Sequence, residues 1–261
     1  MRKIRRIFCA LLSLFLVLGL SACSGGGYRV IDTYSTEGDY VISFRQGDRL
    51  CDIVTAALQE LAHNGTLSSV SLKWFGEDIV SLKAKGGEMA EFQEEVAATS
   101  RTVTVGVDIT NMPMSYETAE GFLGFDVDLA NYICSYLGWN MAVHAIDPAD
   151  VAIELDSGNI DMAMGIAQDG SKLSVSPAYI SSSYVLVARV SGPVKSRAAL
   201  KGKTLGVVIT DIDVLQRDEK FMQSLGSVTY QTNTDGLFQA LLKDEVDGIL
   251  VPSVVAAYYM K

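Results

Sequence analysis

Histidine and cysteine are scarce in this chain. Its 261 residues include two histidines and four cysteines, without a CxxC pair or a Cys/His spacing typical of zinc sites. His63 and His144 are isolated in the sequence, so we interpret both as structural or surface residues. No Ser-His-Asp set and no nucleophile elbow is visible either. We therefore expect no metal site, no cofactor and no enzyme activity.

Positively charged residues are also fewer than negatively charged ones. The chain holds 21 Lys and Arg against 31 Asp and Glu, which gives a formal net charge of -10 and a pI near 4.7. Nucleic acid is therefore not an expected partner, because its phosphates would be repelled by such a surface. A hydrophobic content of 49% indicates a globular protein with a full-sized core.

The start of the chain indicates its compartment. Four cations among the first six residues precede an apolar run from Ile7 to Leu20, which is too short to span a bilayer comfortably. Leu20-Ser21-Ala22-Cys23 follows, and it is similar to the lipobox of bacterial lipoproteins. We predict a signal peptide over 1–22 and a lipidated tether over 23–27, with two acyl chains on Cys23 holding the protein at the outer side of the cell membrane. An ordinary signal peptide is the alternative.

Two cysteines remain after the predicted cleavage. Cys51 and Cys134 each lie on an expected amphipathic helix, in a compartment that permits disulfides. Two buried thiols are the expected arrangement, and a bridge between them is the alternative.

The rest of the sequence predicts an α/β protein. Short strands at 28–33 and 39–45 flank a turn-like Ser35–Gly38, and a helix from Asp48 ends at Asn64-Gly65. A second short helix follows, and residues 77–101 read as a connector. From Thr102 onward, strand and helix patterns alternate, which is typical of parallel sheets covered by helices.

Several motifs from Thr102 onward resemble those of the amino-acid-type (family 3) bacterial extracellular solute-binding proteins of ABC importers. They occur in the family's order and comprise Val103–Asp108, Met112–Tyr116, Gly124–Ala130, Ser157–Asp161, Ser174–Tyr179, Leu200–Val207 and Leu241–Ala257. The resemblance implies a two-lobe, periplasmic-binding-protein-like (type II) fold.

Segments that resemble the family's last part lie at the front of this chain. Gly38–Asp48, Asn64–Leu67 and Lys73–Gly76 resemble the family's final strand, helix and ending. The block order is that of a circular permutation, and two truncated neighbouring domains are the alternative. The permutation predicts a first lobe over 43–183, including the connector 77–101, and a second lobe formed by 28–42 plus 184–261. Hinge motion is expected around Ser181–Tyr184 and Tyr40–Phe44.

The resemblance also implies how a ligand is held, and here the chain departs from the family. The family's arginine for an α-carboxylate, its aspartate for an α-ammonium, its Gly-Thr pair and its stacking aromatic fall at Asp169, Pro252, Thr210-Asp211 and Asn111. Lys172 and Arg189 are the nearest cations to the lost arginine, although solvated surface roles are expected for both. An ordinary zwitterionic amino acid held in the family's way is therefore not expected, because Asp169 and Asp211 would repel its carboxylate.

Five residues are predicted to line the ligand site: Asn111, Met114, Tyr116, Thr210 and Asp211. Loop packing is the alternative for the first three, and for Asp211 the N-cap of a helix expected over residues 212–223. The function implied is capture of a small-molecule solute for an ABC permease by a monomeric, membrane-anchored protein. A degenerate pair of lobes that recognises a partner protein or an envelope component is the alternative, and an enzyme on the same fold is disfavoured.

Overall fold

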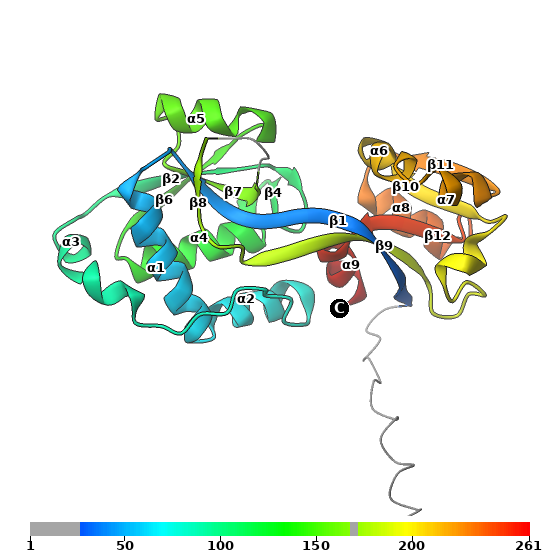
Figure 1. Cartoon of the computed structure of the whole chain (residues 1–261), viewed down its shortest axis with the longest axis horizontal. Helices are drawn as coiled ribbons and strands as arrows, with labels where there is room; N and C mark the ends of the chain where they lie inside the picture. Colours follow the sequence, from blue (N-terminus) through cyan, green and yellow to red (C-terminus); the bar gives the residue numbers. More distant parts are fainter. Residues whose placement is uncertain (1–26, 168–171) are drawn as a thin grey trace, which may run out of the picture.

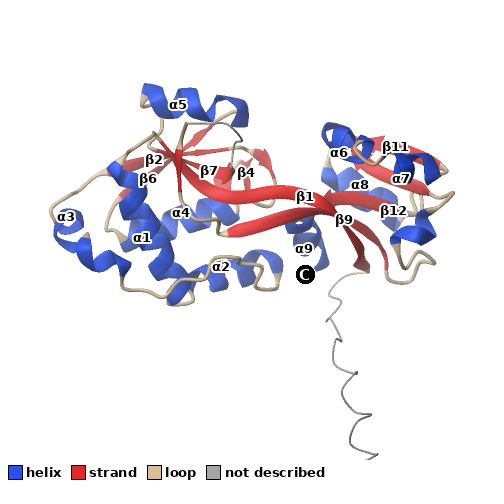
Figure 2. Ribbon diagram, viewed as in Figure 1, coloured by secondary structure: helices blue, strands red, loops and turns tan. Residues whose placement is uncertain are grey.

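The structure is a computed structural model that describes residues 27–167 and 172–261. The predicted signal peptide, the predicted lipidation site Cys23 and Asp169 lie outside the described residues. Figure 1 shows two bodies joined by a pair of long strands, β1 (Tyr28–Phe44) and β9 (Ile180–Arg189). Helices flank strands in both bodies (Figure 2), so the α/β prediction is confirmed.

One mixed sheet runs through both bodies. Its strand order among the described residues is β11-β10-β12-β9-β1-β7-β2-β6, with β8 paired to β1. The strands besides β1 and β9 are β2 (Thr102–Val107), β6 (Asn140–Ala145), β7 (Met162–Ile166), β8 (Ser174–Val175), β10 (Thr204–Val208), β11 (Ser227–Gln231) and β12 (Gly248–Pro252). A small antiparallel sheet consists of β3 (Thr110–Asn111), β4 (Ser115–Thr118) and β5 (Gly121–Leu123).

The first body combines the opening block of the sequence with residues from Thr102 onward. Strand β2 runs parallel to β6 and β7, while β1 pairs antiparallel with β7. Figure 1 shows α5 above these strands and the other long helices below them. The helical elements are α1 (Arg49–His63), α2 (Thr66–Phe75), η1 (Glu88–Glu91), α3 (Gln93–Ala97), α4 (Phe125–Tyr136), η2 (Pro148–Asp150) and α5 (Val151–Ser157).

Helix α1 forms where the sequence predicts it. The carboxylate of Asp48 accepts a 2.9 Å hydrogen bond from the backbone N–H of Leu50, which caps the first turn. Leu50, Ile53, Leu58 and other apolar residues at helical spacing are buried on one face. Gly65, with φ 84°, then allows the left-handed turn into α2.

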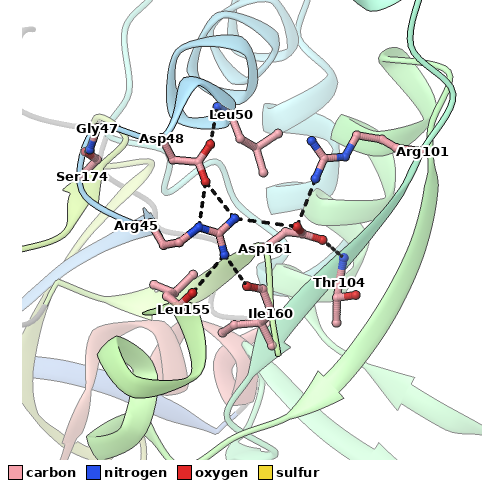
Figure 3. A network of polar contacts seen from close by, with 10 residues as sticks. All are labelled: Arg45, Gly47, Asp48, Leu50, Arg101, Thr104, Leu155, Ile160, Asp161 and Ser174. Carbon is pink, nitrogen blue, oxygen red and sulfur yellow. Dashed lines mark hydrogen bonds and ion pairs between the residues drawn. The ribbon is translucent and has the colours of Figure 1, made fainter. Parts of the chain in front are cut away.

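A polar cluster ties the end of β1 to the strands that follow Thr102 (Figure 3). Arg45 Nη1 donates to the carbonyl oxygens of Leu155 (2.9 Å) and Ile160 (3.3 Å), and its Nη2 lies 2.8 Å from Asp48 Oδ2. Asp161 accepts from Arg101 Nη2 at 3.0 Å and from the Thr104 backbone N–H at 2.8 Å. The opening block is thus anchored inside the first body.

The second body has its own core. Strand β10 lies parallel to β11 and β12, and β12 pairs antiparallel with β9. Leu186, Leu205, Leu215 and Leu250 are fully buried in one apolar cluster. The helical elements are η3 (Arg197–Leu200), η4 (Ile209–Asp211), α6 (Ile212–Gln216), α7 (Glu219–Ser224), α8 (Thr234–Leu242) and α9 (Ser253–Met260).

Two expectations about local structure were wrong. The turn predicted at Ser35–Gly38 is part of the continuous strand β1, because these residues pair with β9 through successive β-bulges. The single helix expected over residues 212–223 is divided into α6 and α7, because the Asp218 side chain caps a new helix by accepting from the Phe221 N–H at 3.0 Å. Cys51 and Cys134 are free thiols, and burial raises the pKa of Cys134 to about 11.

Candidate ligand-binding site

A cavity of about 250 Å³ lies at the carboxyl ends of β2 and β7. Its wall is formed by Ser43, Asp108, Asn111, Ile146, Pro148, Val151 and the stretch Ala163–Ala167. In open α/β sheets, ligands bind beyond the carboxyl ends of the parallel strands. The position of this cavity makes it the first candidate for a ligand site.

The three predicted residues of the first loop have different surroundings. Asn111 lines the cavity. Met114 is fully buried in the main apolar cluster. Tyr116 packs against Trp74, with the ring centroids 6.2 Å apart. Burial is the main reason why the pKa of Tyr116 is raised, and Tyr258 raises it further. Of the three, Asn111 is the one that the structure places in the cavity wall, and ligand contacts by Met114 and Tyr116 stay predictions.

Thr210 and Asp211 lie at the carboxyl end of β10, in the second body. Thr210 is exposed, while Asp211 is half-buried and accepts hydrogen bonds from the hydroxyls of Tyr184 (3.3 Å) and Thr210 (3.4 Å). Asp211 occupies the N-cap position of α6, as the alternative expected, but its side chain makes no capping hydrogen bond. Its carboxylate is directed at the crossing strand β9 instead.

Sequence reasoning missed an acidic residue beside Asp211. Glu37 is the extra residue of the bulge between the pairs Thr36–Ser183 and Gly38–Ser182, and the atom Oε2 of Glu37 is buried without a hydrogen-bond partner. Burial raises the pKa of Glu37 to about 7, a hydrogen bond with Ser182 lowers it, and the Asp211 carboxylate raises it further. Burial is also the main reason why the pKa of Asp211 is raised. The residues around this bulge are typical of turns, so the sequence does not indicate a bulged strand. In the structure, the bulge brings the carboxyl groups of Glu37 and Asp211 close enough to affect each other.

Tyr40 links this acidic pair to the cavity. The side chain is fully buried, and its hydroxyl has no hydrogen-bond partner at normal geometry. Burial raises the pKa of Tyr40 well above its usual value, the Glu37 carboxylate raises it further, and the Asn111 side chain lowers it. The pKa of Tyr40 thus responds both to Asn111 of the first body and to Glu37 of the crossing strand.

A second buried acid supports this region from the first body. Asp126, at the start of α4, is completely buried and accepts a 2.7 Å hydrogen bond from the Tyr179 hydroxyl, while its Oδ2 has no partner. Burial raises the pKa of Asp126 to about 7. Tyr179 lies against Tyr40, with the ring centroids 6.3 Å apart.

The cations near the expected arginine position do not reach the cavity. Arg189 forms an ion pair with Asp244 and donates to the Leu242 carbonyl at 3.4 Å. Lys172 is exposed. The cavity wall itself includes neither lysine nor arginine. In the described part of the chain, no group of three or more His, Cys, Asp or Glu is arranged to hold a metal ion.

Comparison with solved structures defines the class of fold. A polar amino acid ABC uptake transporter substrate binding protein from Streptococcus thermophilus is 27% identical, with a TM-score of 0.54 over 65% of this chain and 66% of that one. An ancestral cationic amino acid solute binding protein has a TM-score of 0.55 at 22% identity, over 66% of this chain and 76% of that one. The fold is thus that of the two-lobe, type II periplasmic amino-acid-binding proteins.

The family follows from the sequence comparison. The profile of the bacterial extracellular solute-binding proteins, family 3, matches residues 103–246, and this chain belongs to that family. Arginine-binding extracellular protein ArtP of Bacillus subtilis is 23% identical over 166 residues, 62% of this chain and 65% of that protein. The lysine/arginine/ornithine-binding periplasmic protein of Escherichia coli is 27% identical over 167 residues, 62% and 64%. The chain therefore spans slightly less than two thirds of the length of these relatives. Within its described residues, no helix is long and apolar enough to cross a membrane.

Proposed function

We propose that this protein captures a small polar solute between its two bodies and delivers it to an ABC importer. The observation that carries the proposal is the cavity at the carboxyl ends of β2 and β7, beside the strands that cross between the bodies. Membership of a solute-binding family supports it. The names of the relatives, which specify arginine, lysine and ornithine, suggest an amino-acid-like solute.

The proposed lobes are 43–183 and 28–42 plus 184–261, with capture by hinge closure. Strands β1 and β9 pair from Tyr28–Arg189 to Tyr40–Ile180 along the connection between the bodies. Three bulges interrupt this ladder, at Ile31, Tyr34 and Glu37. Bulges weaken a ladder locally, so bending of the paired strands is expected there. Asn111 on one lobe and Thr210 and Asp211 on the other would then approach a common solute.

A circular permutation within the family is part of the proposal. Residues 28–76 supply β1, α1 and α2, and these pack in the body formed by residues after Thr102. Tyr28 in β1 and Tyr259 in α9 both contact the ring of Phe238, at centroid distances of 5.1 and 4.0 Å. The two segments thus lie side by side, as they do when one follows the other along an unpermuted chain.

Anchoring through Cys23, a monomeric state and an ABC permease as partner complete the proposed function. The signal-like start of the sequence supports the anchor. Radiolabelled fatty acid supplied to cells expressing the full chain should be incorporated, and Cys23→Ala should abolish that incorporation.

A solute screen tests the proposed function. Purified protein is titrated with amino acids, amines, sugars and nucleosides while its unfolding temperature is followed. A solute present at about 100 times its dissociation constant adds about 2.7 kcal/mol to the unfolding free energy. Asn111→Ala should reduce the shift, because Asn111 lines the cavity. No shift with any solute would refute the proposal and favour recognition of a partner protein or an envelope component.

A further inference from the structure

The described part of the chain holds two neighbouring acids, Glu37 and Asp211, and none of its ion pairs supplies them with a cation. From their arrangement we infer that the solute presents an ammonium or guanidinium group to Glu37 and Asp211, and carries no carboxylate beside that group. Amines and guanidines without a carboxyl group are the class that this describes. The inference rests on the proposed function, because it specifies the solute of the same site.

Both acids belong to the proposed second lobe and lie next to the crossing strand β9. Glu37 belongs to the bulged part of β1, and Asp211 ends the loop after β10. Tyr184 of β9 pairs with Ser35, two residues before Glu37, and its pKa, raised mainly by burial, is raised further by both carboxylates. The Tyr184 hydroxyl donates to Asp211 Oδ1 at 3.3 Å. A cation bound to the two acids would therefore be held by the proposed second lobe, and hinge closure would bring Asn111 of the first lobe toward it.

Hydrogen bonds inside the cluster leave a negative charge uncompensated. Asp211 accepts from two hydroxyls, whereas Glu37 interacts with Ser182 and keeps Oε2 buried without a partner. Among the ion pairs of the described residues, none includes Glu37 or Asp211. Arg217 lowers the pKa of Tyr184, but it is not a cause of the pKa shift of Glu37 or of Asp211. Two carboxyl groups near each other and shielded from water are disfavoured in their ionised form unless a cation joins them.

The Tyr40 hydroxyl is the second observation that points to a ligand. It is fully buried and has no hydrogen-bond partner at normal geometry among the described residues, and Tyr40 pairs with Ile166 of the cavity wall. Unpartnered buried hydroxyls are rare, and a bound polar group is one reason for their presence. Tyr40 and Gly38, the residue after Glu37, lie against Ile166 of the cavity wall, so the site for the cationic group adjoins the cavity of about 250 Å³.

The cavity gives a carboxylate no partner of opposite charge. Among the described residues its wall has no lysine or arginine, and the one ionisable side chain there, Asp108, is an acid that accepts from Thr110. A solute carboxylate would lose its hydration there and meet further negative charge. Removing that carboxylate should therefore strengthen binding.

Matched pairs of compounds test the inference by calorimetric titration of the full chain without its signal. Agmatine is compared with arginine and cadaverine with lysine, because each pair differs by the carboxyl group; glutamine and glucose serve as solutes without a cationic side chain. We expect each decarboxylated compound to bind at least about tenfold more tightly than its amino acid.

Substitutions then separate the acids from the general charge of the protein. Glu37→Gln and Asp211→Asn preserve shape, and each should weaken agmatine or cadaverine by at least about tenfold. Asp213→Asn removes the same charge from an exposed position two residues away and should leave the affinity within about twofold. Thermal unfolding of each variant shows that it is folded.

Each contrary result has a distinct meaning. Equal or tighter binding of arginine and lysine would overturn the inference and leave the proposed function standing. Unchanged affinity in both Glu37→Gln and Asp211→Asn would do the same. Absence of binding by every compound in the wider solute screen would overturn the inference and the proposed function together.

Discussion

The indole Nε1 of Trp74 donates a 2.7 Å hydrogen bond to Asp128 Oδ2, and the Nζ of Lys73 lies 2.6 Å from the same oxygen. The end of α2 is thereby fixed to the first turn of α4. Phe75 adds an apolar contact with Phe125 of α4, at a centroid distance of 5.4 Å. The opening block of the sequence and the helix after Gly124 consequently form a single packed unit.

Asp128→Ala is expected to destabilise this unit. The substitution leaves the Trp74 N–H without its acceptor, and Trp74 is 8% exposed. A loss of about 1 to 3 kcal/mol in the free energy of unfolding follows from the unsatisfied buried donor. Urea unfolding followed by tryptophan fluorescence measures the change. Asp156→Ala, at an exposed position of α5, should change the same quantity by less than about 0.5 kcal/mol, and equal losses in both variants would contradict this account.

Arg45→Met should have a larger effect on stability. Arg45 holds two carbonyl oxygens, of Leu155 and Ile160, and pairs with Asp48, as Figure 3 shows. Removing it leaves those acceptors and the neighbouring carboxylates of Asp48 and Asp161 without this cation, and we expect a loss of about 2 to 4 kcal/mol.

Arg49→Met is the matched control for Arg45→Met. Arg49 is four residues away, its side chain is 57% exposed, and its ion pairs with Asp52 and Glu95 are 3.3 and 3.4 Å long. Exposed pairs contribute little, so the loss should stay below about 1 kcal/mol. Denaturant titration of both variants measures the two losses in the free energy of unfolding. A loss for Arg49→Met as large as that for Arg45→Met would show that the contacts of Arg45 have no special role in stability.

The buried carboxyl of Asp126 predicts a pH dependence of stability. Its pKa is raised to about 7 in the folded state, above the unfolded value of about 3.9. The folded state therefore keeps a proton that the unfolded state loses, so this contribution is full below about pH 4 and is lost as the pH rises toward about 7. The slope that Asp126 adds reaches about 1.4 kcal/mol per pH unit inside this window.

Asp126→Asn should flatten the profile. The amide oxygen still accepts from the Tyr179 hydroxyl but does not titrate, so the stability of the variant relative to the native protein should increase between pH 4 and pH 7. Glu37, whose pKa is raised to about 7 as well, keeps part of the slope in this variant. Denaturant unfolding at half-unit pH steps measures the difference, with Asp156→Asn as an exposed control. A constant difference across the window would show that Asp126 is ionised in both states.

Local patterns in the sequence were sufficient for the helices and for the alternation after Thr102. The Asp48 cap, the apolar spacing of α1 and the Asn64-Gly65 stop all act within a few residues, so they are readable from the sequence. The segment Ser35–Gly38 was wrongly predicted to be a turn. Its residues are typical of turns, but they form a bulged strand because they pair with β9. That pairing joins residues about 145 positions apart in the chain, as in Thr36 with Ser183, and no local pattern reports it.

The candidate site was predictable to a similar extent. Asn111 and Asp211 follow strands β2 and β10, and strand ends are where sequence reasoning places ligand contacts in α/β proteins. Glu37 was missed because its burial depends on the bulge, and Tyr40 was expected only as part of the hinge. Residues of the crossing strands acquire their surroundings only from tertiary pairing.

Gly38→Ala tests the contact between the crossing strand and the cavity wall. A Cβ at Gly38 would lie 2.5 Å from Cγ2 of Ile166, which lines the cavity. Because Ile166 is branched at Cβ and pairs with Tyr40 across β1 and β7, the conflict must move backbone or displace the side chain into the cavity. Overpacking of this kind costs about 1 to 3 kcal/mol.

Both stability and solute binding should therefore respond to Gly38→Ala. We expect a lower unfolding free energy in denaturant, and an affinity for the best solute of the screen that falls by about tenfold, the equivalent of about 1.4 kcal/mol. Gly192→Ala is the matched control, because its Cβ would meet its nearest neighbour, the Arg189 carbonyl oxygen, at 3.4 Å, an ordinary contact. If Gly38→Ala loses stability and retains its affinity, the strain is absorbed away from the cavity, and Ile166 does not shape the solute site.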